Sequence, residues 1–347
     1  RFILDSNSRI SLSNNDGGTL NTAVGYQAGT ALASGSTENT VFGHQAGLAL
    51  STGDYNTAVG ALALKTEDAG NRAVAVGTGA LFSQNVSDVA GNVAVGFTAG
   101  YYNVTGTNNT AIGHEALLGA SGNSHSYNTA VGATALNSIT TGDFNVALGS
   151  RSGEDLTTGD LNTFVGDYAG HTTTNAKRTV AIGHSCMATG NVTSDAIGTV
   201  AVGYETFNAL TSAIGGTAVG YRSALNATTA EYSTALGYNT LGGNSSTALT
   251  GNRNTAIGAS AGRDMEGASA ENTLLGDSSG IAITTGSQNT CLGKSTAPSS
   301  NTGTNQTVIG YNTTGQSDNS VTIGNSSVTD VYMADDKGAT VHLANIN

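Results

Sequence analysis

Residues 21–29 are Asn-Thr-Ala-Val-Gly-Tyr-Gln-Ala-Gly, and variants of this stretch recur along almost the whole chain. Aligning the copies on the first glycine gives eighteen anchors, most of them seventeen positions apart, as Gly43 is from Gly60. A short repeat at a nearly fixed period is the signature of a solenoid, in which each copy forms one coil and covers its neighbours. The anchors are Gly25, Gly43, Gly60, Gly77, Gly96, Gly113, Gly132, Gly149, Gly166, Gly183, Gly203, Gly220, Gly237, Gly258, Gly276, Gly293, Gly310 and Gly324.

Four columns around the anchor are restricted. Position −4 is Asn in eleven copies, among them Asn21, Asn56 and Asn128; position −3 is always Thr or Val, −1 always Val, Ile, Leu or Phe, and +3 always small. Because side chains alternate along a strand, −3 and −1 share one face, and their character predicts that this face is buried. We expect the anchor glycine where another backbone comes close, and the Asn column as a ladder of amides between coils.

The period of about seventeen positions is too short for a helix plus a strand. We therefore predict an all-β chain, a parallel β-solenoid or β-roll of about eighteen coils. Residues 1–20 would lead into the array, 21–327 would form it, and 328–347 would taper away. With coils about 4.8 Å apart, the rod would be on the order of 85 Å long. Its thin Thr, Val and Ala interior predicts self-association, with three rods in one bundle.

Composition restricts the partners. The net charge is −12, and the twelve basic residues are scattered singly, which argues against nucleic acid. The sequence has no continuous apolar run long enough to span a membrane, so membrane insertion is not expected. The chain begins with Arg1 and without a signal-peptide pattern, which we interpret as a fragment or a processed piece of a longer protein.

Cysteine and ion-binding patterns favour structural roles. Cys186 and Cys291 are six coils apart, roughly 29 Å, so they cannot pair and are expected as small core residues. The Thr-Gly-Asp turns at Asp54, Asp143 and Asp160 are sparser than the motif of calcium-binding solenoids, which favours turn capping. No cofactor or metal is predicted.

The +1 column is aromatic in many coils, and His44, His114 and His184 share it. No two of these three histidines lie on adjacent coils, so the column offers no stacked metal site. The column is interpreted as a seam between subunits, with a sugar-binding stripe as the alternative.

Catalysis has little support. No pair of carboxylates is singled out as a glycosidase would require, there is no tryptophan on which a sugar could stack, and no nucleophile elbow is visible. We therefore predict that the chain is not an enzyme.

Two families resemble these repeats. The Thr-Ala-Val-Gly and Val-Ala-Val-Gly strands, with a small residue three positions on, are similar to the head repeats of trimeric autotransporter adhesins, which implies a left-handed trimeric β-roll. The longer form, Asn-Thr-Ala-Val-Gly-Tyr-Gln-Ala-Gly, more closely resembles bacteriophage tail fibres, notably those of marine phages. Residues 8–16 are also similar to segments that begin such arrays.

The end of the chain supports the phage resemblance. Residues 320–325, 328–333 and 338–342 look like the lead-in to an intramolecular chaperone of the endosialidase tailspike type, which trimerises its fibre and then cuts itself off. The resemblance implies a homotrimeric fibre in the virion, outside the cell. Its partners would be other tail or baseplate proteins and a host surface glycan or protein.

Receptor contacts are expected on the longer coils, because binding residues concentrate on loops held by rigid scaffolds. Extra residues fall in four loops, 82–88, 121–127, 187–195 and 241–249. The alternative is that these are tolerated insertions on a passive shaft. The candidate contact residues are Phe82, Tyr101, Tyr102, His125 and Tyr127.

The predicted function is therefore host attachment by the shaft or distal part of a tail fibre. A bacterial surface adhesin is the alternative. Ice binding through the Thr column is a third hypothesis, and it is disfavoured here because the Thr row is expected to face inward.

Overall fold

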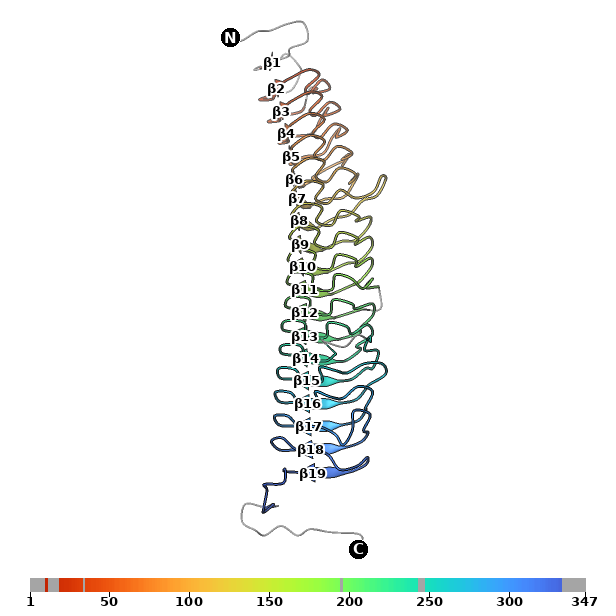
Figure 1. Cartoon of the computed structure of the whole chain (residues 1–347). Helices are drawn as coiled ribbons and strands as arrows, with labels where there is room; N and C mark the ends of the chain where they lie inside the picture. The colour runs from red at the N-terminus through yellow and green to blue at the C-terminus, as the bar shows by residue number, and fades with distance from the viewer. Residues whose placement is uncertain (1–9, 12–18, 34, 194–195, 243–246, 333–347) are drawn as a thin grey trace.

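The computed structural model describes residues 10–11, 19–33, 35–193, 196–242 and 247–332, and it is a long rod with one β-sheet along its length (Figure 1). A two-residue strand, β1 (Ile10–Ser11), precedes eighteen three-residue strands, each of which ends directly before an anchor glycine. These are β2 (Thr22–Val24), β3 (Thr40–Phe42), β4 (Thr57–Val59), β5 (Val74–Val76), β6 (Val93–Val95), β7 (Thr110–Ile112), β8 (Thr129–Val131), β9 (Val146–Leu148), β10 (Thr163–Val165), β11 (Val180–Ile182), β12 (Val200–Val202), β13 (Thr217–Val219), β14 (Thr234–Leu236), β15 (Thr255–Ile257), β16 (Thr273–Leu275), β17 (Thr290–Leu292), β18 (Thr307–Ile309) and β19 (Val321–Ile323).

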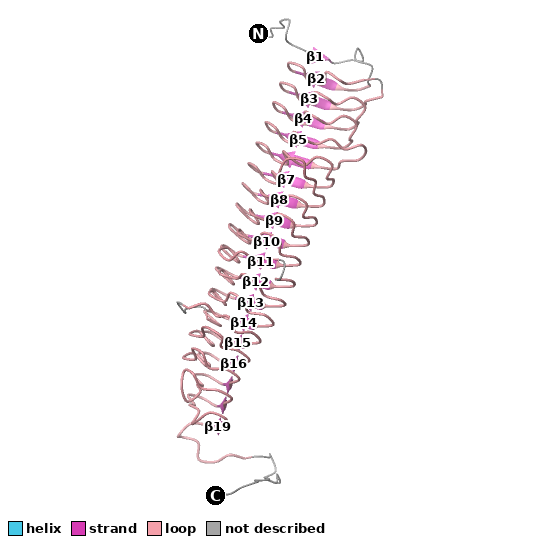
Figure 2. Ribbon diagram, turned by 90° about the vertical axis from the view of Figure 1, so that its right-hand side faces the viewer, coloured by secondary structure: helices cyan, strands magenta, loops and turns pink. Residues whose placement is uncertain are grey.

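The strands stack in sequence order. From β2 to β19 each strand pairs in parallel with the next, and equal columns pair with each other, as Thr163 with Val180 and Val165 with Ile182. Strand β1 pairs antiparallel with β2. Figure 2 shows the result: the strands form the rungs of one ladder, and the rest of each coil is turn and loop. The predicted all-β parallel solenoid, with one repeat of about seventeen positions in each coil, is confirmed.

The predicted direction of the strand faces is wrong. The middle residue of each strand, at −2, points into the coil: Ala58 and Phe164 are fully buried, and their neighbours at −3 and −1 are only half-buried. The inward column is Ala in twelve of the eighteen coils, because a narrow coil has room for little more than a methyl group. The β-branched and apolar side chains lie on the outside. We call the −3 and −1 side chains of β2–β19 the outward strip.

The anchor glycines behave as predicted. A Cβ on Gly149 would lie 2.5 Å from the carbonyl oxygen of Gly166 on the next coil, and φ at Gly149 is +136°. Every anchor from Gly25 to Gly293 faces the carbonyl group of the following anchor in the same way. Glycine is therefore required at this column by close stacking of backbones.

The predicted Asn ladder is confirmed. The side-chain oxygen of Asn128 accepts hydrogen bonds from the backbone N–H of Asn145, at 2.9 Å, and from its side-chain amide, at 3.1 Å. The Asn145 oxygen accepts the same two bonds from Asn162, both at 3.0 Å. These asparagines are buried, so the ladder satisfies polar groups that no water reaches.

Two other structural predictions are confirmed. The carboxylate of Asp143 accepts a hydrogen bond from the backbone N–H of Ser126 at 2.6 Å, and Asp160 accepts one from Asp143 at 3.0 Å, so both acids cap turns of the preceding coil. Cys186 and Cys291 are free and fully buried, and burial raises the pKa of each thiol to about 12. Neither cysteine is therefore expected to be reactive at neutral pH.

Candidate receptor-binding surface

Three of the predicted contact residues come together on one side of the rod. The rings of Phe82 and Tyr101 stack with centroids 4.6 Å apart and planes 2° apart. Tyr102 meets Tyr101 edge-on, at 4.7 Å and 74°. The Lys65 ammonium lies 5.2 Å from the centre of the Phe82 ring. These side chains come from three successive coils, so a cluster that is dispersed in sequence is continuous in space.

A surface hollow of about 270 Å³ lies beside this cluster. We call it the aromatic hollow. One coil supplies four of its lining residues and the next coil supplies the other two; they are Phe97, Thr98, Tyr101, Tyr102, Glu115 and Leu118.

The walls of the aromatic hollow are held by contacts between coils. The backbone N–H of Glu115 donates to the carbonyl of Phe97 at 2.9 Å, and that of Tyr102 donates to the carbonyl of Leu118 at 3.0 Å. His114 stacks on the Phe97 ring at 5.4 Å. Side chains mounted on a stacked backbone lose little freedom when a ligand arrives, which favours binding.

The polar groups of the hollow are an acid and a hydroxyl. A Glu115 carboxylate oxygen lies 3.9 Å from the His114 ring nitrogen, a pair that is ionic only when the imidazole is protonated. The Thr98 hydroxyl oxygen is buried and has no hydrogen-bond partner among the described residues. The site can therefore offer a carboxylate acceptor and apolar ring surfaces to one small ligand.

The prediction that His125 contacts a receptor is wrong. Its side chain is 1% exposed, so this residue of the 121–127 loop is buried rather than presented at the surface. Neither ring nitrogen has a hydrogen-bond partner among the described residues, and burial lowers the pKa of His125 to about 4. The interior of the rod has room for an imidazole ring at this level, and the sequence around His125 does not indicate this.

The burial of His125 makes the fold sensitive to acid. The unfolded imidazole titrates near pH 6.5 and the folded one at about 4, so the folded chain binds fewer protons between these values. The contribution of the neutral, buried imidazole to the free energy of unfolding is fully present above pH 6.5. It is lost as the pH falls towards 4, and the total loss is about 3 kcal/mol. Urea unfolding of the parent and of His125→Leu should show a shallower pH dependence in the variant. Equal slopes would contradict the buried neutral imidazole.

Tyr127 is exposed but lies apart from the hollow. It stacks on Phe144 of the next coil, with centroids 4.8 Å apart and planes 3° apart. Parts of the other two predicted loops, residues 194–195 and 243–246, lie outside the described residues, as do residues 333–347 of the predicted tapering segment.

The +1 column forms a stack of rings. His184, Tyr204, Tyr221 and Tyr238 follow one another with centroids 5.2 to 5.4 Å apart and nearly parallel planes. Each inner ring has both faces covered by its neighbours, so only ring edges face the solvent. Sugars stack on ring faces, and this arrangement therefore weakens the hypothesis of a sugar-binding stripe.

An ion pair lies beside this stack. Glu205 and Arg222 approach to 2.7 Å, and the bond to Glu205 raises the pKa of Arg222. Both side chains are partly exposed, so the pair contributes little to stability.

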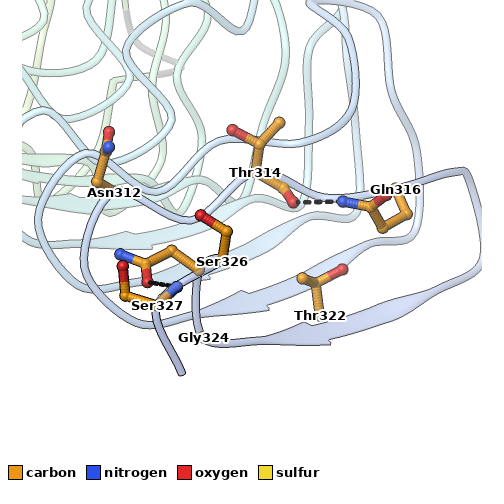
Figure 3. A pocket seen from close by; sticks show the side chains of 8 residues that line it. Asn312, Thr314, Gln316, Thr322, Gly324, Ser326 and Ser327 are labelled. Atoms are coloured by element: carbon orange, nitrogen blue, oxygen red, sulfur yellow. Dashed lines mark hydrogen bonds between the residues drawn. The ribbon is translucent and has the colours of Figure 1, made fainter. Parts of the chain in front are cut away.

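A second hollow lies at the C-terminal end of the rod, beside β18 and β19. It measures about 350 Å³ and is lined by amide and hydroxyl side chains, among them Asn312, Gln316 and Ser326 (Figure 3). Its polar groups are partly used locally: the Gln316 amide donates to the Thr314 carbonyl at 3.2 Å. Its lining residues come from the coils of β18 and β19, the last two described strands.

Metal and membrane sites have no support in the described part of the chain. There, no three His, Cys, Asp or Glu side chains gather in a way that could hold a metal ion. The same part contains no helix long and apolar enough to cross a membrane. Neither a protein-family model nor a curated protein sequence matches this chain.

Proposed function

We propose that the chain is a structural fibre protein, the shaft or distal part of a phage tail fibre, which acts as a homotrimer in host attachment. The observation that carries the proposal is the outward strip. It has no Asp, Glu, Lys or Arg in any of its eighteen coils, and several of its large side chains are well exposed, including Phe42 at 55% and Leu275 at 44%. A single chain rarely leaves so long an apolar surface in water without a partner.

Another copy of the chain is the occupant that fits the strip best. The strip repeats with every coil, so only a surface with the same period can match it along the whole rod. Strands of three residues along a rod of about 85 Å give on the order of 800 Å² per chain, which is the contribution of one partner to a stable interface. Three strips facing a common axis make a closed assembly, as most oligomers are.

The rival functions differ in what the outward strip does. A bacterial surface adhesin would use the same trimer on a different anchor. One objection to ice binding no longer holds, because the Thr column at −3 faces outward. Its flanking −1 column, however, holds side chains as unequal as Phe42, Val59 and Leu148, and an uneven row is a poor match to a crystal plane. Thermal hysteresis of the purified chain would favour ice binding over attachment.

A cysteine placed in the outward strip tests the contact between copies. Val219→Cys should form disulfide-linked dimers on mild oxidation, because equivalent residues of a trimer meet near its axis. The matched control is Thr211→Cys, which is exposed in a turn outside the sheet and should stay monomeric on a denaturing gel. The two native cysteines are buried and add little background. Equal cross-linking of both variants would contradict contact through the strip.

Antibody labelling separates the phage from the bacterial assignment. Gold-labelled antibody against the chain should mark the tail fibres of virions in electron micrographs. Labelling confined to the surface of bacterial cells would overturn the phage assignment in favour of the adhesin.

A further inference from the structure

We infer that the aromatic hollow binds one uncharged pyranose ring of a saccharide. This inference rests on the proposed attachment function, since it names the chemistry that the rod would recognise on a cell. The hollow combines ring surfaces from Phe97, Tyr101 and Tyr102 with the carboxylate of Glu115. Pyranose rings present the matching set, with apolar C–H faces and hydroxyl donors around the rim.

The size of the hollow selects a single ring. Its volume of about 270 Å³ lies just below the range of roughly 300–1,000 Å³ that is typical of sites for drug-sized ligands. The hollow is bounded on the next coil by Glu115 and Leu118, so a ligand would lie across two coils. A longer glycan would extend from it into solvent.

The polar groups of the hollow select against negative charge. Glu115 is a hydrogen-bond acceptor when ionised, and a sugar hydroxyl can donate to it. The Thr98 hydroxyl oxygen is buried beneath the surface of the hollow, so the carboxylate is the polar group that a ligand would meet. No Lys or Arg is among the residues that line the hollow, and the chain carries a net charge of −12. A uronic or sialic acid would therefore meet an uncompensated carboxylate.

The ring faces at the hollow are supported rather than loose. Tyr101 rests on Phe82 at 4.6 Å, and Tyr102 stands at 74° to Tyr101, so the two tyrosines form adjoining walls. Tyr102 meets its neighbour edge-on, unlike the inner rings of the +1 column from His184 to Tyr238, which cover each other's faces. The hollow is thus the better place for a sugar face.

Saturation-transfer NMR on the full chain tests the inference. The probes are the methyl glycosides of glucose, galactose, mannose and N-acetylglucosamine, with methyl glucuronide and tetramethylammonium as comparison ligands. At least one neutral glycoside should receive saturation on its ring protons, and methyl glucuronide should receive much less. Tyr102→Ala and Glu115→Gln should each weaken the binding roughly tenfold. The control Tyr238→Ala, at the end of the ring stack, should leave it unchanged.

Four results would overturn the inference: no transfer to any neutral glycoside, equal transfer to the glucuronide, unchanged binding in Tyr102→Ala, or binding of tetramethylammonium alone. The last would indicate a cage for quaternary ammonium groups instead. Light scattering on the same samples separates this outcome from the proposed function. Trimers that bind no glycoside would contradict the saccharide site and leave the proposed trimer standing. Monomers that bind a glycoside would contradict the trimeric fibre and leave the saccharide site standing.

Discussion

Replacing Phe164 by Asp should unfold the coils around β10, whereas replacing its neighbour Val165 by Asp should leave them folded. Phe164 is fully buried, and its ring fills the space left by Gly153 and Gly170. The change removes a large core side chain and introduces a carboxylate, at a cost of about 5 kcal/mol or more. Val165 is half-buried in the outward strip, so its replacement should separate the chains of the proposed trimer instead.

Circular dichroism and light scattering, measured together, distinguish these two effects. Phe164→Asp should lose β-structure or melt far below the parent. Val165→Asp should keep its β-structure at a lower molecular mass. Equal losses of β-structure in the two variants would mean that the direction of the strand faces is misassigned.

The second large effect is expected at the anchor column. A Cβ on Gly149 would lie 2.5 Å from the Gly166 carbonyl oxygen, where only backbone movement can relieve the contact, and φ is +136°. Strain and overpacking together should lower the free energy of unfolding of Gly149→Ala by about 4 kcal/mol. Urea unfolding measures this change directly.

Gly122 provides the matched control. Its φ is also positive, at +82°, but a Cβ there would meet no atom within 4 Å. Gly122→Ala should therefore cost about 1 kcal/mol, from backbone strain alone. Similar losses in the two variants would show that φ, rather than close stacking of coils, is the reason for glycine at the anchor.

The repeat made much of this fold predictable. The anchor glycine and the small +3 residue recur in all eighteen coils and the ladder asparagine in eleven, because successive coils repeat the same stacking contacts, so these columns are visible in one sequence. Position Gly149 shows this clearly, because its neighbour across the contact is the next anchor. Asn145 shows it too, bonding to Asn128 on one side and Asn162 on the other.

The direction of the strand faces could not be predicted from the same pattern. Alternation with a period of two separates the side chains into two sets but does not say which set is inside. Hydrophobicity usually decides, and here it indicates the wrong face, because the coil interior accepts Ala58 and Ala75 while the larger Val59 and Val76 lie outside. Large apolar residues on an outer face are what an interface between chains would require.

The candidate site was only partly predictable. Tyr101 and Tyr102 stand out in the sequence as adjacent aromatic residues near an insertion, and both line the hollow. Glu115 and Leu118 were missed, since their columns vary from coil to coil and only stacking brings them beside the tyrosines. The burial of His125 depends on how one irregular loop folds back, which no repeated column records.

The central claim is that three chains meet through the outward strip, and the molar mass of the parent in solution tests it most directly. Multi-angle light scattering of the purified chain at neutral pH should give three times the chain mass of 34.4 kDa, unchanged on dilution to low micromolar concentration. A stable, well-folded particle of 34.4 kDa would contradict the account, because the uncharged strip would then remain in water along the whole rod.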